Sequence, residues 1–280
     1  MATLQQIHRA AAQRHDYPLD SRTEPDRLVL QAEVWEPAAR EMIAQIGVES
    51  GWRGVDLGCG VRGILEPLAD AVGAIGTVIG VDNDPLLLAA ARAWANERSL
   101  DNVWLFRDDA LRTDLPRGIY DLVHARFLFS PLGREEALLK EMIDLTRPGG
   151  VIAIQEPDSA SWNCHPRRAG FDALKPAILR AFRAGGGDFD AGVRLFDMLR
   201  RAGLADVQVR AHVVALPPGN PYRRLPVQLA HSLRRRILEG ELLTASQFSA
   251  AIADCEAAAD DGATVFTTFT LMQAWGRKPA

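Results

Sequence analysis

The chain has 280 residues, of which 48% are hydrophobic and 24% charged, and its formal net charge is -4. This composition is ordinary for a globular protein with one large domain or two small ones. The negative balance gives no electrostatic basis for general binding to nucleic acid, which prefers a basic face.

The termini and cysteines restrict the setting further. The N-terminal stretch carries charged residues and no apolar core, so it does not resemble a secretory signal, and no run approaches the ~20 apolar residues of a membrane span. The cysteines, Cys59, Cys164 and Cys255, are odd in number and widely spaced, which predicts no disulfide framework and no metal cluster. We therefore expect a cytoplasmic monomer or homodimer without a membrane or nucleic-acid partner.

Two helices are predicted before the first strand. Residues 2–16 carry apolar side chains at helical spacing, and Tyr17-Pro18 would end that helix. A second helix is predicted from about Glu24 to Ile46, where Gly47 is a typical end signal.

The middle of the chain alternates strands and helices. Strands are predicted near 53–58, 76–82, 103–109, 120–127 and 151–156, and helices near 62–72, 85–98 and 134–146. This alternation predicts an α/β fold with a parallel sheet covered by helices on both faces.

The first strand leads into a glycine-rich turn, Gly58-Cys59-Gly60-Val61-Arg62-Gly63. Its spacing matches the G-x-G-x-x-G fingerprint of dinucleotide-binding proteins, in which glycine permits positive φ and close approach of a ligand. Asp56, however, lies in the strand just before the turn, where it would repel a pyrophosphate and attract an amine or a sulfonium. An NAD-dependent oxidoreductase is therefore the minor alternative.

The chain beyond the fifth strand is longer than a minimal fold needs. Helices are predicted near 167–183 and 192–202, separated by three glycines, followed by a strand over 207–216. Residues 217–262 are predicted to be mainly helical, and 263–275 form a last strand rich in β-branched and aromatic residues.

Five motifs in order give the chain a family resemblance. The segment Val55–Gly60 (VDLGCG) resembles motif I of the class I S-adenosylmethionine-dependent methyltransferases. The later motifs are Val81-Asp82, Asp108-Asp109-Ala110, Tyr120-Asp121-Leu122-Val123 and Arg147-Pro148-Gly149-Gly150. Together they cover roughly residues 50–160, and the general type most similar to them is the bacterial small-molecule methyltransferase.

The resemblance implies a particular architecture. We expect a Rossmann-like, seven-stranded, mostly parallel sheet whose seventh strand is antiparallel, with helices on both faces. An N-terminal helical lid would span 1–46, and a methyltransferase core would span 47–280, with substrate-cap insertions at about 159–205 and 217–262.

The same resemblance implies S-adenosylmethionine as the cofactor, bound where the carboxyl ends of the strands converge. Asp56 would attract its ammonium group, Asp82 the ribose hydroxyls and Asp109 the adenine amino group, with Asp108 as the alternative to Asp109. Arg126 would bind a carboxylate of the cofactor or of the substrate. The full expected set is Tyr17, Asp56, Gly58, Cys59, Gly60, Asp82, Asn83, Asp109, Ala110, Ala125 and Arg126.

Several candidate residues have a structural alternative, among them Arg126, which could pair with a structural acid such as Glu156. Asp56 could be a buried carboxylate satisfied by N–H groups of the turn, and Asp82 could cap a helix together with Asp84. His124 lies in the middle of a strand and fits a core histidine better than a base. Trp35 fits a core residue, and Tyr17 a turn residue, better than contacts of a lid.

The acceptor side is less defined. Candidate bases are Glu156, His124 and His231, and candidate substrate contacts are Trp35, Glu156, Trp162, Tyr222 and His231. The predicted function is methyl transfer to an O, N or C nucleophile of a small molecule, compatible with secondary metabolism. The second alternative is a protein that binds S-adenosylmethionine without consuming it.

Overall fold

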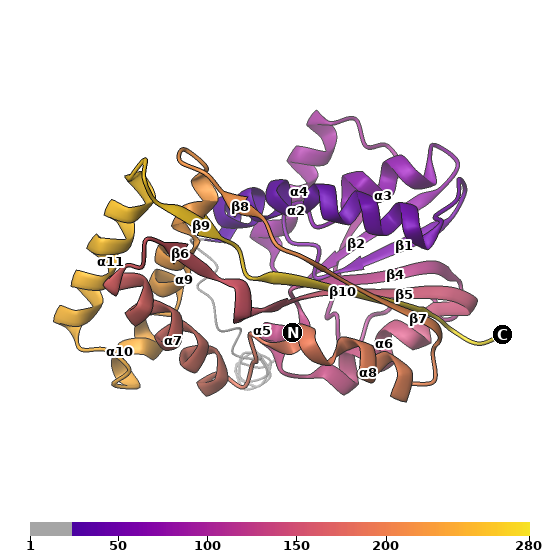
Figure 1. Cartoon of the computed structure of the whole chain (residues 1–280). Coiled ribbons are helices and arrows are strands. Elements are labelled where there is room, and N and C mark those ends of the chain that lie inside the picture. The colour runs from indigo at the N-terminus through magenta and orange to yellow at the C-terminus, as the bar shows by residue number, and fades with distance from the viewer. Residues whose placement is uncertain (1–23) are drawn as a thin grey trace, which may run out of the picture.

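The computed structural model describes residues 24–280 (Figure 1), so Tyr17 and the helix predicted over 2–16 lie outside the described residues. Within them, seven strands form the main sheet in the order β3-β2-β1-β4-β5-β10-β7. These strands are β1 Arg53–Leu57, β2 Thr77–Asp82, β3 Val103–Arg107, β4 Tyr120–Arg126, β5 Thr146–Asp158, β7 Ala205–His212 and β10 Thr270–Arg277.

The direction of the strands agrees with the sequence-based expectation. Strands β3, β2, β1, β4 and β5 are mutually parallel, whereas β10 is antiparallel to both β5 and β7. Parallel strands carry their motifs to the same edge, so the carboxyl ends of β1, β2, β3, β4 and β5 define one edge of the sheet. We call it the carboxyl edge.

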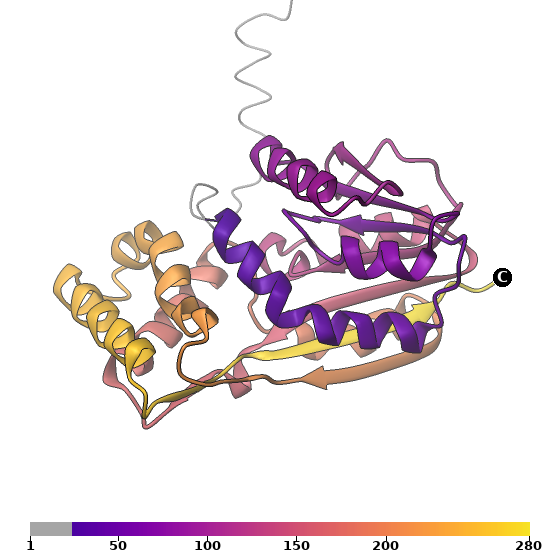
Figure 2. The same ribbon diagram turned by 90° about the horizontal axis from the view of Figure 1, so that it is seen from above.

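Helices cover both faces of this sheet, as the two views show (Figures 1 and 2). On one face lie α2 Glu24–Ile46, α3 Leu65–Val72 and α4 Pro85–Glu97, and on the other α5 Phe129–Leu132, α6 Glu135–Leu145 and α8 Leu195–Arg201. The start of α4 follows from local sequence, because Asp84 accepts the N–H of Leu86 at 2.8 Å and Pro85 occupies the first turn.

A second group of elements lies beside the main sheet and forms what we call the helical subdomain. Its helices are α7 Ala169–Ala184, α9 Leu225–Ser232, α10 Arg234–Glu239 and α11 Ala245–Asp260, with short 3-10 turns at Ser159–Ser161 and Pro221–Arg224. It also contains a small antiparallel sheet of β6 Asn163–His165, β9 Val265–Thr267 and β8 Ala215–Leu216. Its aromatic core includes Trp162, Phe171 and Phe266.

This small sheet was not predicted. The strands expected over 207–216 and 263–275 are each interrupted, and their outer parts leave the main sheet to pair in the subdomain. The interruption is held in place by Thr268, whose backbone N–H donates to the Val214 carbonyl and whose hydroxyl accepts the Val214 N–H, both at 3.0 Å. An alternating pattern shows that a segment is extended, but it does not show where it changes sheets.

The segment expected as a single cap over 159–205 divides between the two parts of the molecule. Helix α7 belongs to the helical subdomain, whereas the 3-10 turn Ala191–Arg194 and α8 pack on β5, β10 and β7. Close packing there needs a glycine, since a Cβ on Gly192 would lie 2.7 Å from the Glu156 carbonyl oxygen.

Helix α2 connects the two cores. Trp35 and Ala38 contribute to the core of the helical subdomain, while Ala39, Met42 and Ile46 pack on the main sheet. The helix thus spans the junction between both parts. Between residues 24 and 280 no helix has the length and apolarity required to cross a membrane.

Candidate active site

The turn between β1 and α3 has backbone angles that require glycine. Gly58, Gly60 and Gly63 have φ of 68°, 55° and 48°, in the left-handed region that other residues rarely adopt. The Cys59 N–H between them donates to the Val81 carbonyl at 3.0 Å, which holds the turn on β2. The Cys59 side chain is buried beneath the turn, and burial raises the pKa of its thiol, so only its backbone lies along the turn.

Side chains approach this turn from two sides. A Cβ on Gly58 would lie 2.8 Å from Leu128, which follows β4, and a Cβ on Gly60 would lie 3.3 Å from Leu28 of α2. The two leucine side chains therefore lie directly against the backbone of the turn, in which Gly60 is buried, and α2 lies beside it. The absence of Cβ atoms lets another group approach the backbone this closely, as a turn that binds a ligand through its backbone requires.

Asp82 ends β2 next to the turn. Its Oδ2 accepts the Gly60 N–H and its Oδ1 accepts the Asp84 N–H, each at 2.9 Å. Burial raises the pKa of this carboxyl. Since each carboxylate oxygen has a second lone pair and the side chain remains partly exposed, Asp82 can still accept hydrogen bonds from a ligand. Asn83 is exposed, and its carbonyl accepts Arg107 Nε at 3.2 Å.

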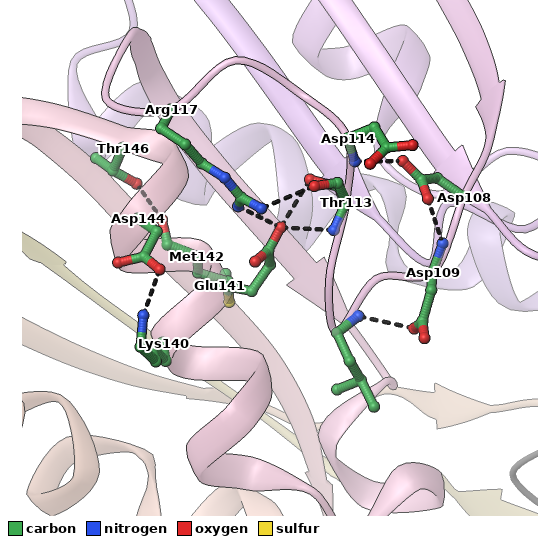
Figure 3. Close-up of polar contacts among 11 residues, drawn as sticks. Asp108, Asp109, Thr113, Asp114, Arg117, Lys140, Glu141, Met142, Asp144 and Thr146 are labelled. Carbon is green, nitrogen blue, oxygen red and sulfur yellow. Dashed lines mark hydrogen bonds and ion pairs between the residues drawn. The ribbon is translucent and has the colours of Figure 1, made fainter. Parts of the chain in front are cut away.

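The loop after β3 is shaped by its own acids (Figure 3). Asp108 accepts the N–H groups of Asp109 and Asp114, at 2.8 and 2.7 Å, and so serves the loop itself. Asp109 is exposed, beside the partly exposed Ala110, and within residues 24–280 its carboxylate accepts only the Leu111 N–H, through Oδ1 at 2.9 Å. Of the two acids, Asp109 therefore has the oxygen available for a ligand.

A buried cluster that the sequence analysis missed anchors the far end of this loop. Glu141 of α6 is 5% exposed and accepts the N–H and hydroxyl of Thr113 at 2.8 and 2.7 Å, and Arg117 Nη1 at 2.5 Å. A loop of this length without a helix needs such a tie to hold Asp109 at the carboxyl edge (Figure 3).

Asp56 and His124 lie inside the protein rather than in an open site. Asp56 is 1% exposed, and its two oxygens contact Ile64 N–H at 3.0 Å and His124 Nδ1 at 2.7 Å. His124 is fully buried, and its Nε2 is engaged by Gln155 at 2.9 Å. The candidate role of His124 as a base is therefore wrong, because both ring nitrogens already have partners. Asp56 has the buried, satisfied geometry of its structural alternative.

Arg126 ends β4 with its cation inside the molecule. The side chain is 8% exposed, and Nη2 donates to the Gly63 carbonyl at 2.6 Å, whereas Nη1 is buried without a partner among residues 24–280. Burial lowers the pKa of this guanidinium, and the nearby Asp56 partly offsets that effect. A buried N–H of a cation calls for an anion. Ala125, before it, is fully buried, so only its backbone could meet a ligand.

Glu156 holds a strained turn. Phe127 has φ of 55°, unusual for a bulky residue, and the three N–H groups that follow it, of Leu128, Phe129 and Ser130, donate to Glu156 at 2.7, 2.9 and 3.0 Å. Glu156 is fully buried, and burial raises its pKa to about 8, against the lowering effect of those N–H groups. Its oxygens therefore face the backbone and are not open to an acceptor, which contradicts its candidate roles as base and substrate contact.

The other candidate substrate residues divide into two groups. Trp35 and Tyr222 meet: the Trp35 indole N–H donates to the Tyr222 hydroxyl at 3.4 Å, and both are fully buried. Trp162 is 2% exposed and stacks on Phe189, with ring centroids 5.5 Å apart, inside the helical subdomain. The core interpretation holds for Trp35 and Trp162, and neither has surface open to a substrate.

His231 does not join these residues. It lies exposed on α9 with its ring against Phe248 of α11, at 6.0 Å. Both helices belong to the helical subdomain and not to the main sheet. The structure thus brings together the turn of 58–63, Asp82, Asp109 and Arg126. Of the proposed bases, His231 lies away from them, whereas His124 and Glu156 lie close by but are buried with their polar atoms engaged.

Comparison with known proteins agrees with this geometry. A family model described as a methyltransferase domain matches residues 55–150. Nocamycin O-methyltransferase from Saccharothrix syringae is 30% identical over 188 residues, 63% of this chain and 67% of that protein. Demethylmenaquinone methyltransferase from Geobacillus sp. (strain WCH70) is 26% identical over 190 residues, 61% of this chain and 79% of that protein.

The fold is also that of a solved structure. The YcgJ protein from Bacillus subtilis superposes with a TM-score of 0.57 at 14% identity, over 86% of this chain and 98% of that one. The matched residues 55–150 contain the glycine turn, Asp82, Asp109 and Arg126, which lie at the carboxyl edge. These findings favour methyl transfer over the nicotinamide alternative, and the chain belongs to the class I S-adenosylmethionine-dependent methyltransferases.

Proposed function

We propose that this enzyme methylates an O, N or C nucleophile of a small molecule at the carboxyl edge of its main sheet. The observation that carries the proposal is the convergence there of a glycine turn at positive φ, two carboxylates that can accept further hydrogen bonds, Asp82 and Asp109, and the buried cation Arg126. The named relatives support the acceptor class, because one methylates nocamycin and another demethylmenaquinone, as their names state.

The residues fit S-adenosylmethionine. Asp82 would accept from the ribose hydroxyls, and Asp109 with the Ala110 N–H would meet the adenine, each with the oxygen or N–H that the loop leaves available. Arg126 Nη1, an orphaned buried donor, matches a carboxylate, which the methionine part of the cofactor supplies. Without Cβ atoms at Gly58 and Gly60, a ligand could contact the backbone of the turn once the Leu128 and Leu28 side chains that lie against it turn aside.

The mechanism rests on positioning. The cofactor supplies an activated methyl group on a sulfonium, so no metal or strong base is required of the chain for that activation. The turn and Asp82 fix the bound group in one orientation, and Arg126 fixes its charged end. Leu28 on α2 and Leu128 after β4 flank the turn and restrict water there.

We also propose that the first half of α2 belongs to a lid, within an N-terminal region of residues 1–46. Leu28 beside Gly60 supports this, as does the salt bridge of Glu33 on α2 with Arg62 in the turn, at 3.1 Å. The remaining residues, 47–280, would form the core, with the helical subdomain as its substrate cap.

Calorimetry with S-adenosylmethionine and S-adenosylhomocysteine tests the proposal directly. Binding of both, followed by conversion of the first to the second with a panel of small-molecule acceptors, is the expected result. Binding without turnover for any acceptor would favour the non-methylating alternative. Absence of binding to either compound would reject the site.

Replacing Asp82 by alanine should weaken S-adenosylhomocysteine binding by about 1–3 kcal/mol, as expected for loss of hydrogen bonds to a charged group. The reason is that Asp82 both accepts from the ribose and holds the Gly60 N–H. Asp144→Ala is the matched control, since the Asp144 carboxylate pairs with the exposed Lys140 on α6, away from the carboxyl edge. Equal affinity of the folded Asp82 variant and wild type, measured by calorimetry, would reject the ribose role.

A further inference from the structure

A row of buried polar side chains crosses one face of the main sheet, and the mechanism above does not use it. Its members lie on four adjacent strands: Asp56 on β1, His124 on β4, Gln155 on β5 and Gln273 on β10, each at most 1% exposed. Asp56 is opposite His124 in the register, and Gln155 is opposite Gln273, so each pair shares a face. We call these four residues the polar row.

The hydrogen bonds of the polar row have a direction. His124 Nε2 lies 2.9 Å from the Gln155 side-chain nitrogen, and Gln273 Nε2 donates to Gln155 Oε1 at 3.1 Å. An amide nitrogen only donates, so His124 Nε2 must accept and its proton must lie on Nδ1, facing Asp56. Every bond therefore donates toward the carboxylate, an arrangement in which successive bonds strengthen one another.

One end of the polar row is bonded to the end of the glycine turn, and the other end is bonded to α2. At one end, Asp56 Oδ2 accepts the Ile64 N–H at 3.0 Å and thereby fixes the end of the glycine turn. At the other end, Gln273 Nε2 also donates to the Ala38 carbonyl of α2 at 3.0 Å. The same helix places Leu28 beside Gly60.

Packing alone does not account for this row. Apolar side chains could fill the same face, since replacing both partners of a buried hydrogen bond by apolar groups is often nearly neutral. What the polar row adds is a chain of hydrogen bonds between the glycine turn and α2, two elements that lie side by side at Gly60. Gln273 Oε1 is buried without a hydrogen-bond partner in the described part of the chain. Gln273 therefore contributes to the polar row only as a donor, through the two N–H bonds of its amide nitrogen.

We propose that Asp56, His124, Gln155 and Gln273 are positioning residues, which hold the glycine turn and α2 in the relative placement that binds the cofactor. This inference rests on the proposed function. It predicts that replacing Gln273 lowers the affinity for the cofactor. Three hydrogen bonds separate Gln273 from Asp56, so Gln273 acts only through the polar row.

Calorimetry on the full chain tests this with two matched variants. Gln273→Met removes the donors at the far end of the polar row. Thr146→Val removes one buried hydrogen bond, from the Thr146 hydroxyl to the Met142 carbonyl at 2.7 Å, at the opposite end of β5 from the carboxyl edge. Gln273→Met should weaken S-adenosylhomocysteine binding about two- to thirtyfold, the range of coupling through packed networks, while Thr146→Val leaves it unchanged.

A measurement on the wild-type chain keeps the proposal falsifiable if Gln273→Met does not fold. With ¹⁵N-labelled histidine, His124 should give the nitrogen signals of a neutral ring protonated on Nδ1, identified by their loss in His124→Asn. A ring protonated on Nε2 would overturn the inference, as would equal weakening in both calorimetric variants or none in Gln273→Met. Failure of the wild type to bind at all would instead reject the proposed function.

Discussion

Replacing Gly63 by alanine is expected to abolish cofactor binding and to lower the free energy of unfolding by about 3 kcal/mol or more. A Cβ at this position would lie 2.0 Å from Asp56 Oδ2 and 2.9 Å from the Cys59 carbonyl oxygen. The Asp56 side chain cannot move aside cheaply, because it is buried and bonded to Ile64 and His124. The substitution must therefore break the end of the turn as well as strain φ.

Gly47→Ala is the matched control for the backbone part of this effect. Gly47 has φ of 73°, and a Cβ there would meet nothing within 4 Å. The free energy of unfolding of Gly47→Ala should fall by only about 1–2 kcal/mol, the cost of a residue other than glycine in the left-handed region. This variant should bind S-adenosylhomocysteine with wild-type affinity. Urea denaturation and calorimetry of both variants give the comparison. A similar decrease in the free energy of unfolding for both variants, with cofactor binding retained in Gly63→Ala, would show that Asp56 does not hold the turn.

The sheet and its flanking helices could be predicted because their signals are local. The apolar runs and helical periods gave elements that agree with the structure within a few residues, as for β2, predicted over 76–82 and found at Thr77–Asp82. The antiparallel last strand came from the family resemblance. The small sheet of the helical subdomain could not be predicted, since its pairing of β6 with β9 joins segments about 100 residues apart.

The site was predictable where backbone conformation demands a residue type. Gly58 and Gly60 are where positive φ is needed, and Asp82 lies beside them as expected. The prediction of Glu156 and His124 as catalytic bases was wrong, because residue type does not show which way a strand residue faces or which groups already bind its polar atoms. The sequence did contain one unused signal: Gln155 and Gln273 are polar residues within apolar strands, which marks a buried network.

The second large effect concerns Glu156. Glu156→Leu should lower the free energy of unfolding by about 3 kcal/mol or more, because three buried N–H groups, those of Leu128, Phe129 and Ser130, lose their acceptor at about 1–3 kcal/mol each. Glu156→Gln keeps one acceptor oxygen but turns an amide nitrogen toward a backbone donor, so an intermediate loss is expected. Urea denaturation measures this difference. If the free energy of unfolding of Glu156→Leu falls by less than about 1 kcal/mol, the N–H groups of the turn must find other acceptors.

The raised pKa of Glu156 predicts that the free energy of unfolding depends on pH. Burial raises the pKa of Glu156 to about 8 from an ordinary value of 4.5, so between these values the folded chain holds a proton that the unfolded chain has lost. The contribution of this carboxyl to stability is then complete below pH 4.5 and disappears as the pH rises through 8. The stability difference between wild type and Glu156→Gln, which has no such proton, should therefore narrow across this range. Because other titrating groups cancel in that difference, a constant or widening gap would show that Glu156 is ionised in the folded chain, its charge held by the three N–H groups after Phe127.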